Sequence, residues 1–501
     1  MPYSIVRRCL KKRRGVGLSA PFFMEKFFME LYILSNTVKH RFGDSFGRGT
    51  RLSLVGARGE RVAFQAILPK PFHNAFAEAD GEWDAEIFWE RYVKLSASSS
   101  GLTTAGEYPD VMVDASRAEK FKDNTSERGE GVLWCFVTIP ADAAGRHTVR
   151  LEVTADEGKA AVEAEIEVLD FCLPEQNGNV TSFAIREDMI KSADPGEFRK
   201  KYDELVEEHL HYRLSPTKLL PYGTWGIEEA LSEARKRTAD VRCAAYSLPY
   251  KTFREDTIYE KEQECLDTDY LRKLLTAFAE NSTDECDLLK KANFYITFID
   301  EPAPERFHSV RRVYREIHDL KREVAKSVDF TGRRGVENSL LTLDNIVTVF
   351  NKEPIYGEVD TWCPTYWGYF KPEYVYEEKK LRGLGKKNWW YGCVAPKTPF
   401  PNLHTDSPMR DSRFESWLRF LYDISGNLYW ATNLTKKYDE KAREYTDCDV
   451  LKETLLFPGA CGDGLLFYTE TKYGAPLPSL RLFSLCLLYT SPSPRDGATS
   501  R

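Results

Sequence analysis

The chain has 501 residues, of which 42% are hydrophobic and 29% are charged, a balance typical of folded globular proteins that excludes wholesale disorder. This length fits two domains better than one. There are 70 Lys and Arg residues and 77 Asp and Glu residues, and the net charge of −7 argues against nucleic acid or an anionic membrane as the main partner.

The first 46 residues are interpreted as an N-terminal extension, in which residues 29–46 are a candidate for a first strand. The basic cluster Lys11–Arg14 near its start suits nuclear localisation or RNA binding, but a solvated terminus is the simpler interpretation. The apolar run that follows is too short for a secretory signal. No run in the chain reaches the ~18–20 apolar residues of a membrane-spanning helix. We therefore expect no membrane span. The sequence leaves the compartment open, and the lack of a signal peptide favours the cytoplasm.

Residues 47–178 predict a β-sandwich domain. Every second residue is apolar in Thr148–Val153 and in Val162–Val168, which is the spacing of half-buried strands. No helical pattern of similar strength interrupts these runs, and several short strands between turns are typical of a sandwich. The turn-rich stretch Leu173–Gly178 marks the expected end of this domain.

Residues 179–483 predict a (β/α)8 barrel, because eight apolar strand candidates alternate with helical segments. The strand candidates are Thr181–Ile185, Ser215–Leu220, Ala244–Pro249, Phe294–Ile299, Ile346–Phe350, Val359–Cys363, Trp389–Val394 and Asn427–Ala431. The clearest helix carries an apolar stripe from Phe307 to Val328, and a shorter stripe runs from Phe414 to Leu421. An open doubly wound sheet is the alternative architecture.

The sequence contains no motif for a cofactor or a metal. It has no glycine-rich phosphate-binding motif and no clustered His ligands. Its 11 Cys are scattered singly without a CxxC pair, which argues against a zinc ribbon and a disulfide framework. We therefore expect no cofactor and no metal.

The C-terminal segment Ser484–Arg501 becomes rich in Ser and Pro and resembles the translated adapter tails that end some metagenomic gene models. We expect it to be a non-native tail and leave it out of the fold. The last element of the barrel would then be missing, and we expect this to affect the stability of the barrel more than its catalytic chemistry.

Two adjacent carboxylates, Asp300 and Glu301, follow the fourth predicted strand and precede Pro302. The C-terminal ends of barrel strands are where active sites form. Adjacent acids repel each other, so we expect one of the pair to stay protonated beside a charged partner. The alternative is that the two acids begin the following helix, where negative charge is favoured. Spacing alone does not separate these interpretations.

Aromatic residues gather at the ends of the last three predicted strands. Five of the 10 Trp fall there, at positions 362, 367, 389, 390 and 430. A Trp in a barrel strand is ordinarily part of the core. Rings concentrated at three consecutive strand ends opposite two carboxylates are also what a glycosidase uses, because the rings bind the sugar and the acids act on the glycosidic oxygen.

Several motifs together resemble glycoside hydrolase family 123. They are FIDEP, DTWCP, the WWY segment, LYWATN and GDGLLFY followed by PLPSLRL, and the resemblance extends from about residue 47 to 483. It implies a β-sandwich joined to a catalytic barrel. It also implies a retaining β-N-acetylgalactosaminidase that uses the substrate's own acetamido group as nucleophile, so the partner would be a glycan or glycoconjugate.

The resemblance also implies roles for individual residues. Glu301 would be the general acid and then the base, while Asp300 would orient the 2-acetamido group that forms an oxazolinium intermediate. The implied sugar pocket comprises Trp362, Tyr366, Trp390, Tyr391, Trp430 and Asn433. Asp463, between two glycines, is interpreted as a turn residue. The rival hypotheses are a non-catalytic carbohydrate-binding protein on the same scaffold and a purely structural module, and the sequence leaves the oligomeric state open.

Overall fold

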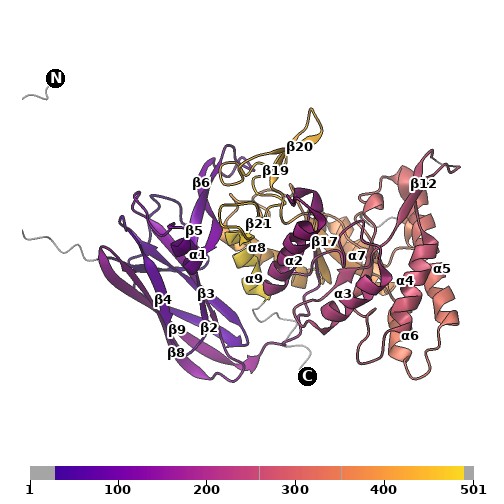
Figure 1. Ribbon diagram of the computed structural model, residues 1–501, viewed down its shortest axis with the longest axis horizontal. Helices are drawn as coiled ribbons and strands as arrows, with labels where there is room; N and C mark the ends of the chain where they lie inside the picture. The colour runs from indigo at the N-terminus through magenta and orange to yellow at the C-terminus, as the bar shows by residue number, and fades with distance from the viewer. Residues whose placement is uncertain (1–28, 259, 351–352, 490–501) are drawn as a thin grey trace, which may run out of the picture.

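The computed structural model describes residues 29–258, 260–350 and 353–489. They form a β-rich N-terminal part and a larger part in which a parallel sheet is surrounded by helices (Figure 1). In this portion of the chain no helix combines the length and the apolar character needed to cross a membrane.

The N-terminal part consists of two sheets that share one core. One sheet has the order β1 (Tyr32–Ser35), β3 (Arg61–Leu68), β7 (Gly131–Thr138), β5 (Ala85–Leu95), β6 (Gly106–Asp114). The other has the order β2 (Arg51–Arg58), β9 (Gly158–Cys172), β8 (Gly145–Ala155), β4 (Phe76–Asp80). The alternation seen in the sequence places Val149, Leu151 and Val153 of β8 in this core. The predicted β-rich region is therefore confirmed, although β4, β6 and the short helix α1 (Ala115–Lys120) were not anticipated.

The second part contains a seven-stranded parallel sheet that is nearly closed. Its order is β10 (Thr181–Phe183), β18 (Gly426–Tyr429), β17 (Lys387–Gly392), β16 (Thr361–Trp362), β15 (Asp344–Val347), β14 (Ala292–Tyr295), β11 (Tyr246–Ser247). The segment 215–218 lies between the two edge strands, through parallel bridges from Phe183 to Pro216 and from Lys218 to Ser247. All eight predicted strand regions thus contribute backbone to one barrel-like sheet.

Helices cover this sheet, but they do not follow a regular (β/α)8 pattern. They are α2 (Pro195–His211), α3 (Ile227–Ala239), α4 (Thr268–Glu280), α5 (Phe307–Ser327), α6 (Arg334–Leu341), α7 (Pro372–Gly383), α8 (Met409–Leu421) and α9 (Leu480–Tyr489). Both α5 and α6 lie between β14 and β15, whereas the described residues between β15 and β16 include a 3₁₀ turn, Glu353–Ile355, and no α-helix. The barrel prediction is therefore confirmed in outline, and its ideal repeat is broken at these two connections.

The two predicted apolar stripes had different outcomes. On α5, Val310, Val313 and Ile317 are fully buried, as expected. On α8 the predicted stripe faces outward instead, and Trp417 is 55% exposed. The polar side of α8 is buried because it finds partners there: Glu415 accepts a hydrogen bond of 2.8 Å from the Trp390 indole N–H. That prediction was wrong, since periodicity defines a helix face without saying where the face points.

Helix α9 corrects the expected C-terminal boundary. It continues past residue 484, and the side chains of residues 484–487 are buried. The Ser484 hydroxyl donates to the Met409 carbonyl oxygen at 3.0 Å, and the Cys486 thiol donates to the Tyr212 carbonyl oxygen at 3.3 Å. The expectation that the chain leaves the fold at 484 is therefore wrong for this stretch, because its apolar residues complete a packed helix. Residues 490–501, like 1–28, lie outside the described residues.

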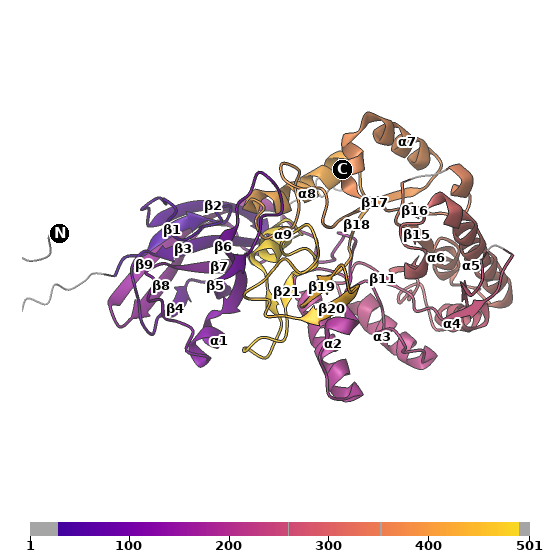
Figure 2. The same cartoon turned by 90° about the horizontal axis from the view of Figure 1, so that it is seen from above.

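Helix α9 also joins the sandwich to the barrel, between which it lies in both views (Figure 1, Figure 2). The Phe483 ring packs against Phe88 and Phe136 of the sandwich, with centroid distances of 4.8 and 4.7 Å. Two residues earlier, Arg481 forms a buried ion pair of 2.7 Å with Asp110 of β6. Since the penalty for burying these charges is offset only when they stay paired, this contact fixes how the two parts dock.

Candidate active site

The acid pair lies at the C-terminal end of β14. The strand ends at Tyr295, and a 3₁₀ turn, Thr297–Ile299, follows before Asp300 and Glu301. The fourth strand thus ends earlier than the sequence predicted, and the turn carries the two acids beyond the sheet edge. In a parallel barrel this edge is where loops from different strands meet.

The backbone of Glu301 adopts a left-handed conformation, with φ of +41°. A non-glycine residue in this region costs about 1–3 kcal/mol, and such strain concentrates at functional sites. The strain is held by a hydrogen bond of 2.8 Å that the Glu301 N–H donates to the Thr348 hydroxyl. Helix α5 begins only at Phe307, and its N-terminal cap makes no side-chain hydrogen bond. The alternative that the acids begin the helix is therefore wrong.

Two hydroxyl groups hold Asp300 at a single oxygen. The Thr348 hydroxyl donates to Oδ1 of Asp300, and the Tyr295 hydroxyl donates to the same oxygen at 3.3 Å. Burial, followed by the charge of Asp300, raises the pKa of Tyr295 well above its ordinary value. Tyr295 therefore remains a neutral donor near neutral pH, and both of these hydrogen bonds are made to Oδ1 of Asp300 rather than to Oδ2.

A tyrosine from a different strand holds Glu301. The Tyr391 hydroxyl, on β17, donates to Oε1 of Glu301. Tyr391 is buried, and burial together with the hydrogen bond to Glu301 raises its pKa above the ordinary range. Of the residues predicted for the sugar pocket, Tyr391 is the one that the structure brings to the acid pair.

Comparison with known proteins identifies the catalytic region. Residues 244–486 match the family model described as Glycoside hydrolase 123, catalytic domain. This region is a family 123 glycoside hydrolase domain. The chain is accordingly a glycosidase, as the motifs indicated. No curated protein matches the sequence.

One solved structure supports the fold over most of the chain. A family 123 glycoside hydrolase from Clostridium perfringens, described in connection with glycolipid glycan hydrolysis, has a TM-score of 0.60 at 13% identity, covering 92% of this chain and 87% of that one. Bacteroides uniformis β-glucuronidase 3 has a TM-score of 0.30 at 10% identity, covering 87% and 51%. Parabacteroides merdae β-glucuronidase has a TM-score of 0.25 at 9% identity, covering 81% and 47%. The first likeness shows the fold, and the other two are too distant to carry an argument.

Three aromatic residues predicted for the sugar pocket lie instead in the interior of the family 123 domain. Trp362 and Trp390 are 1% and 0% exposed, and Tyr366 is 2% exposed. Trp390 packs against Tyr366 at a centroid distance of 5.3 Å and bonds to Glu415 of α8. These side chains offer no surface to a ligand, so their assignment is corrected to packing between the sheet and the helices.

Asn433 is a further correction. It is fully buried, and its amide group makes two hydrogen bonds to the backbone of Arg186: Oδ1 accepts from the N–H at 2.7 Å, and Nδ2 donates to the carbonyl oxygen at 3.0 Å. Arg186 follows β10 and Asn433 follows β18. The amide therefore ties together the loops after two adjacent strands and does not reach a ligand.

Trp430 and Asp463 form a unit beside the strand ends that the sequence did not predict. Trp430 is half-buried, and its indole N–H donates to Oδ2 of Asp463 at 3.0 Å. Asp463 is 1% exposed, and burial raises the pKa of its carboxyl to about 7. Gly464, with φ of +74°, lies so close to Trp430 that a Cβ atom would collide with the ring. Asp463 therefore stands in a turn, as predicted, but it also fixes the orientation of Trp430.

Two further residues at the site, Thr348 and Tyr295, were missed by sequence reasoning. Thr348 follows the last residue of β15, and Tyr295 is the last residue of β14. The available signal was the same one that pointed to Asp300, namely a polar group at the C-terminal end of an apolar strand.

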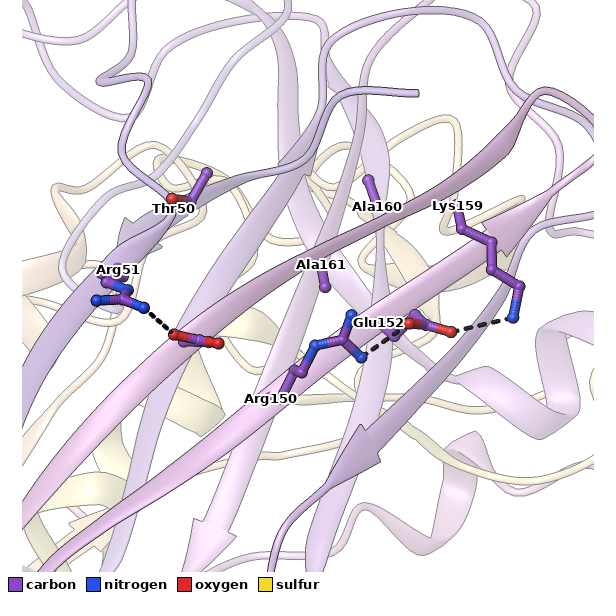
Figure 3. Close-up of a pocket in the computed structure, with 8 residues that line it drawn as sticks. Thr50, Arg51, Arg150, Glu152, Lys159, Ala160 and Ala161 are labelled. Atoms are coloured by element: carbon purple, nitrogen blue, oxygen red, sulfur yellow. Dashed lines mark hydrogen bonds and ion pairs between the residues drawn. The ribbon is translucent and has the colours of Figure 1, made fainter. Parts of the chain in front are cut away.

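A hollow of about 420 Å³ lies elsewhere, on the outer face of the sandwich (Figure 3). Its charged groups already have partners: Arg51 pairs with Glu163 at 3.0 Å, and Glu152 pairs with Arg150 at 2.8 Å and with Lys159 at 3.1 Å. Both acids of this hollow, Glu152 and Glu163, are held in ion pairs with basic side chains, so the acid pair on the barrel remains the candidate site. Among the described residues no three His, Cys, Asp or Glu side chains are grouped as a metal site.

Proposed function

We propose that this glycosidase is a retaining β-N-acetylhexosaminidase, acting on terminal N-acetylgalactosamine through an oxazolinium intermediate formed on a (β/α)8-type barrel. The observation that carries the proposal is the arrangement of Asp300 and Glu301. The two acids are consecutive, and the second has a strained backbone. Two hydroxyl groups hold one oxygen of Asp300, and one hydroxyl group holds one oxygen of Glu301. This leaves Oδ2 of Asp300 and Oε2 of Glu301 for the substrate.

Glu301 acts first as general acid. It donates a proton to the glycosidic oxygen as the bond to the anomeric carbon breaks, which is worth about 10²–10⁴ in rate for a positioned acid. The Tyr391 hydroxyl, donating to Oε1, holds the carboxyl so that the opposite oxygen, Oε2, carries the proton toward the leaving group.

Asp300 acts on the 2-acetamido group of the sugar. Its Oδ2 accepts a hydrogen bond from the acetamide N–H, and its negative charge balances the positive charge that develops as the carbonyl oxygen attacks the anomeric carbon. The product of this step is the oxazolinium ion. No protein carboxylate becomes covalently attached, which is a known exception to the usual two-carboxylate scheme.

The second step reverses the roles at Glu301. Its carboxylate removes a proton from water, the water oxygen bonds to the anomeric carbon, and the oxazolinium ring opens to restore the acetamide. Two displacements at the same carbon leave the β configuration unchanged. The relative from Clostridium perfringens is described in connection with glycolipid glycans, which supports the glycan of a glycolipid or other glycoconjugate as the natural substrate class.

The test combines a panel of p-nitrophenyl β-N-acetylhexosaminides, the matched 2-hydroxyl hexosides and NMR of the first-formed sugar. We expect cleavage of an acetamido sugar, very poor cleavage of its hydroxyl counterpart and a β-anomer as first product. An α-anomer first, or equal cleavage of both sugars, would refute the substrate-assisted mechanism. Sugar binding without any turnover would favour the carbohydrate-binding alternative.

A further inference from the structure

Thr348 lies between the two acids and contacts both. It follows β15 directly, is 4% exposed, and is separated from Glu301 by 47 positions in sequence. Its hydroxyl oxygen accepts the Glu301 backbone N–H at 2.8 Å, and the same hydroxyl donates to Oδ1 of Asp300. A single side chain thus joins the backbone of one acid to the carboxylate of the other.

The direction of the Thr348 proton follows from these contacts. A hydroxyl group has one proton to donate and can accept with its lone pairs. The Glu301 N–H can only donate, so it occupies a lone pair of Oγ1. The proton is then directed at Asp300, whose Oδ1 must accept it.

We propose that Thr348 is a positioning residue that couples the two acids. It holds Glu301 in its left-handed conformation and holds Asp300 as an acceptor whose free oxygen faces the acetamide. This inference rests on the proposed function, because the acetamide is the group that Asp300 would orient. Tyr295, the second donor to Asp300, is at 3.3 Å and has no contact with the Glu301 backbone among the described residues, so it does not replace Thr348.

The test compares Thr348→Val, which keeps the shape and removes the hydroxyl, with Thr348→Ser, which keeps the hydroxyl. We expect Thr348→Val to lose about 10- to 100-fold in kcat, the range for a hydrogen bond to a charged group, with a smaller change in KM. Thr348→Ser should recover most of the activity. If Thr348→Val does not fold, as judged by its melting temperature, Thr348→Ala is used with the same expectation.

A double-mutant cycle with Asp300→Asn separates positioning from a general loss of structure. If the hydroxyl acts partly through Asp300, Thr348→Val should cost several-fold less in the Asp300→Asn background than in the wild type, and the cost that remains reports the contact with the Glu301 backbone. Equal kcat in Thr348→Val and the wild type, or a cost that is unchanged in the Asp300→Asn background, would overturn the inference.

The proposed function is tested separately in the same series. If the wild-type protein does not cleave acetamido sugars, or if Asp300→Asn retains full activity, the proposed function is refuted, and the role of Thr348 is refuted with it. A wild type that cleaves these sugars and is impaired by Asp300→Asn, but not by Thr348→Val, would refute the role of Thr348 alone.

Discussion

Replacing Glu301 by Gln isolates the proton that the proposed mechanism needs. Gln has the same shape as Glu, so the strained backbone and its hydrogen bond to Thr348 are retained. The side-chain amide oxygen still accepts from the Tyr391 hydroxyl, which holds the carboxyl in the wild type. Orientation is therefore preserved, and what is lost is the group that donates and accepts the proton.

The expected cost follows from general acid catalysis. A positioned acid contributes about 10²–10⁴-fold, so Glu301→Gln should lower kcat/KM by at least ~10²-fold, equivalent to about 2.7 kcal/mol of transition-state free energy. Because a good leaving group departs without a proton, the loss should shrink as the pKa of the leaving alcohol falls.

The assay measures kcat/KM for a series of aryl β-N-acetylhexosaminides with leaving groups of increasing acidity, for the wild type and for Glu301→Gln. The melting temperatures of the two proteins should agree, which shows that the fold is intact. Near-normal cleavage of a substrate with a poor leaving group by a folded Glu301→Gln protein would refute the assignment of the general acid.

Three other predictions follow from the site. Asp300→Asn should lower turnover as well, but a better leaving group should restore little of the lost activity, since the missing charge acts on the acetamide. If better leaving groups restored the activity of Asp300→Asn as they restore that of Glu301→Gln, the proposed role of Asp300 would be contradicted. Trp390→Ala should cost ~3–5 kcal/mol of stability, whereas Trp430→Ala, at a half-buried ring, should weaken sugar binding by about 1–3 kcal/mol. Thermal midpoints and binding isotherms of the two variants distinguish these effects. Normal sugar binding by a folded Trp430→Ala protein would show that the Trp430 ring belongs to the core. Burial raises the pKa of the Asp463 carboxyl to about 7 from its ordinary value of 3.8. The folded state therefore holds this proton more tightly than the unfolded state does, and the stability of the fold decreases as the pH rises through 7. The melting temperature of Asp463→Asn relative to that of the wild type should therefore increase between pH 5 and pH 8, and a constant difference would contradict the buried environment.

The order of elements and the identity of the acid pair were determined by sequence, because both depend on patterns among residues that are close together in the chain. The buried face of α5 follows from residues three and four apart, and each strand region of the barrel is a short apolar run between turns. Asp300 and Glu301 stand out because a polar pair ends one of these runs. Such signals need no knowledge of which segments later become neighbours.

The direction of each side chain was decided only by the tertiary structure. Adjacent residues in a strand face opposite sides, so sequence shows that Trp390 and Tyr391 diverge, but not which one faces inward. The packing of β17 sends Trp390 outward to Glu415 of α8 and Tyr391 inward to Glu301. The same holds for contacts between distant segments, such as the 47 positions that separate Thr348 from Glu301. This contact exists only after β14 and β15 have paired, because the parallel pairing of these strands brings their C-terminal ends together.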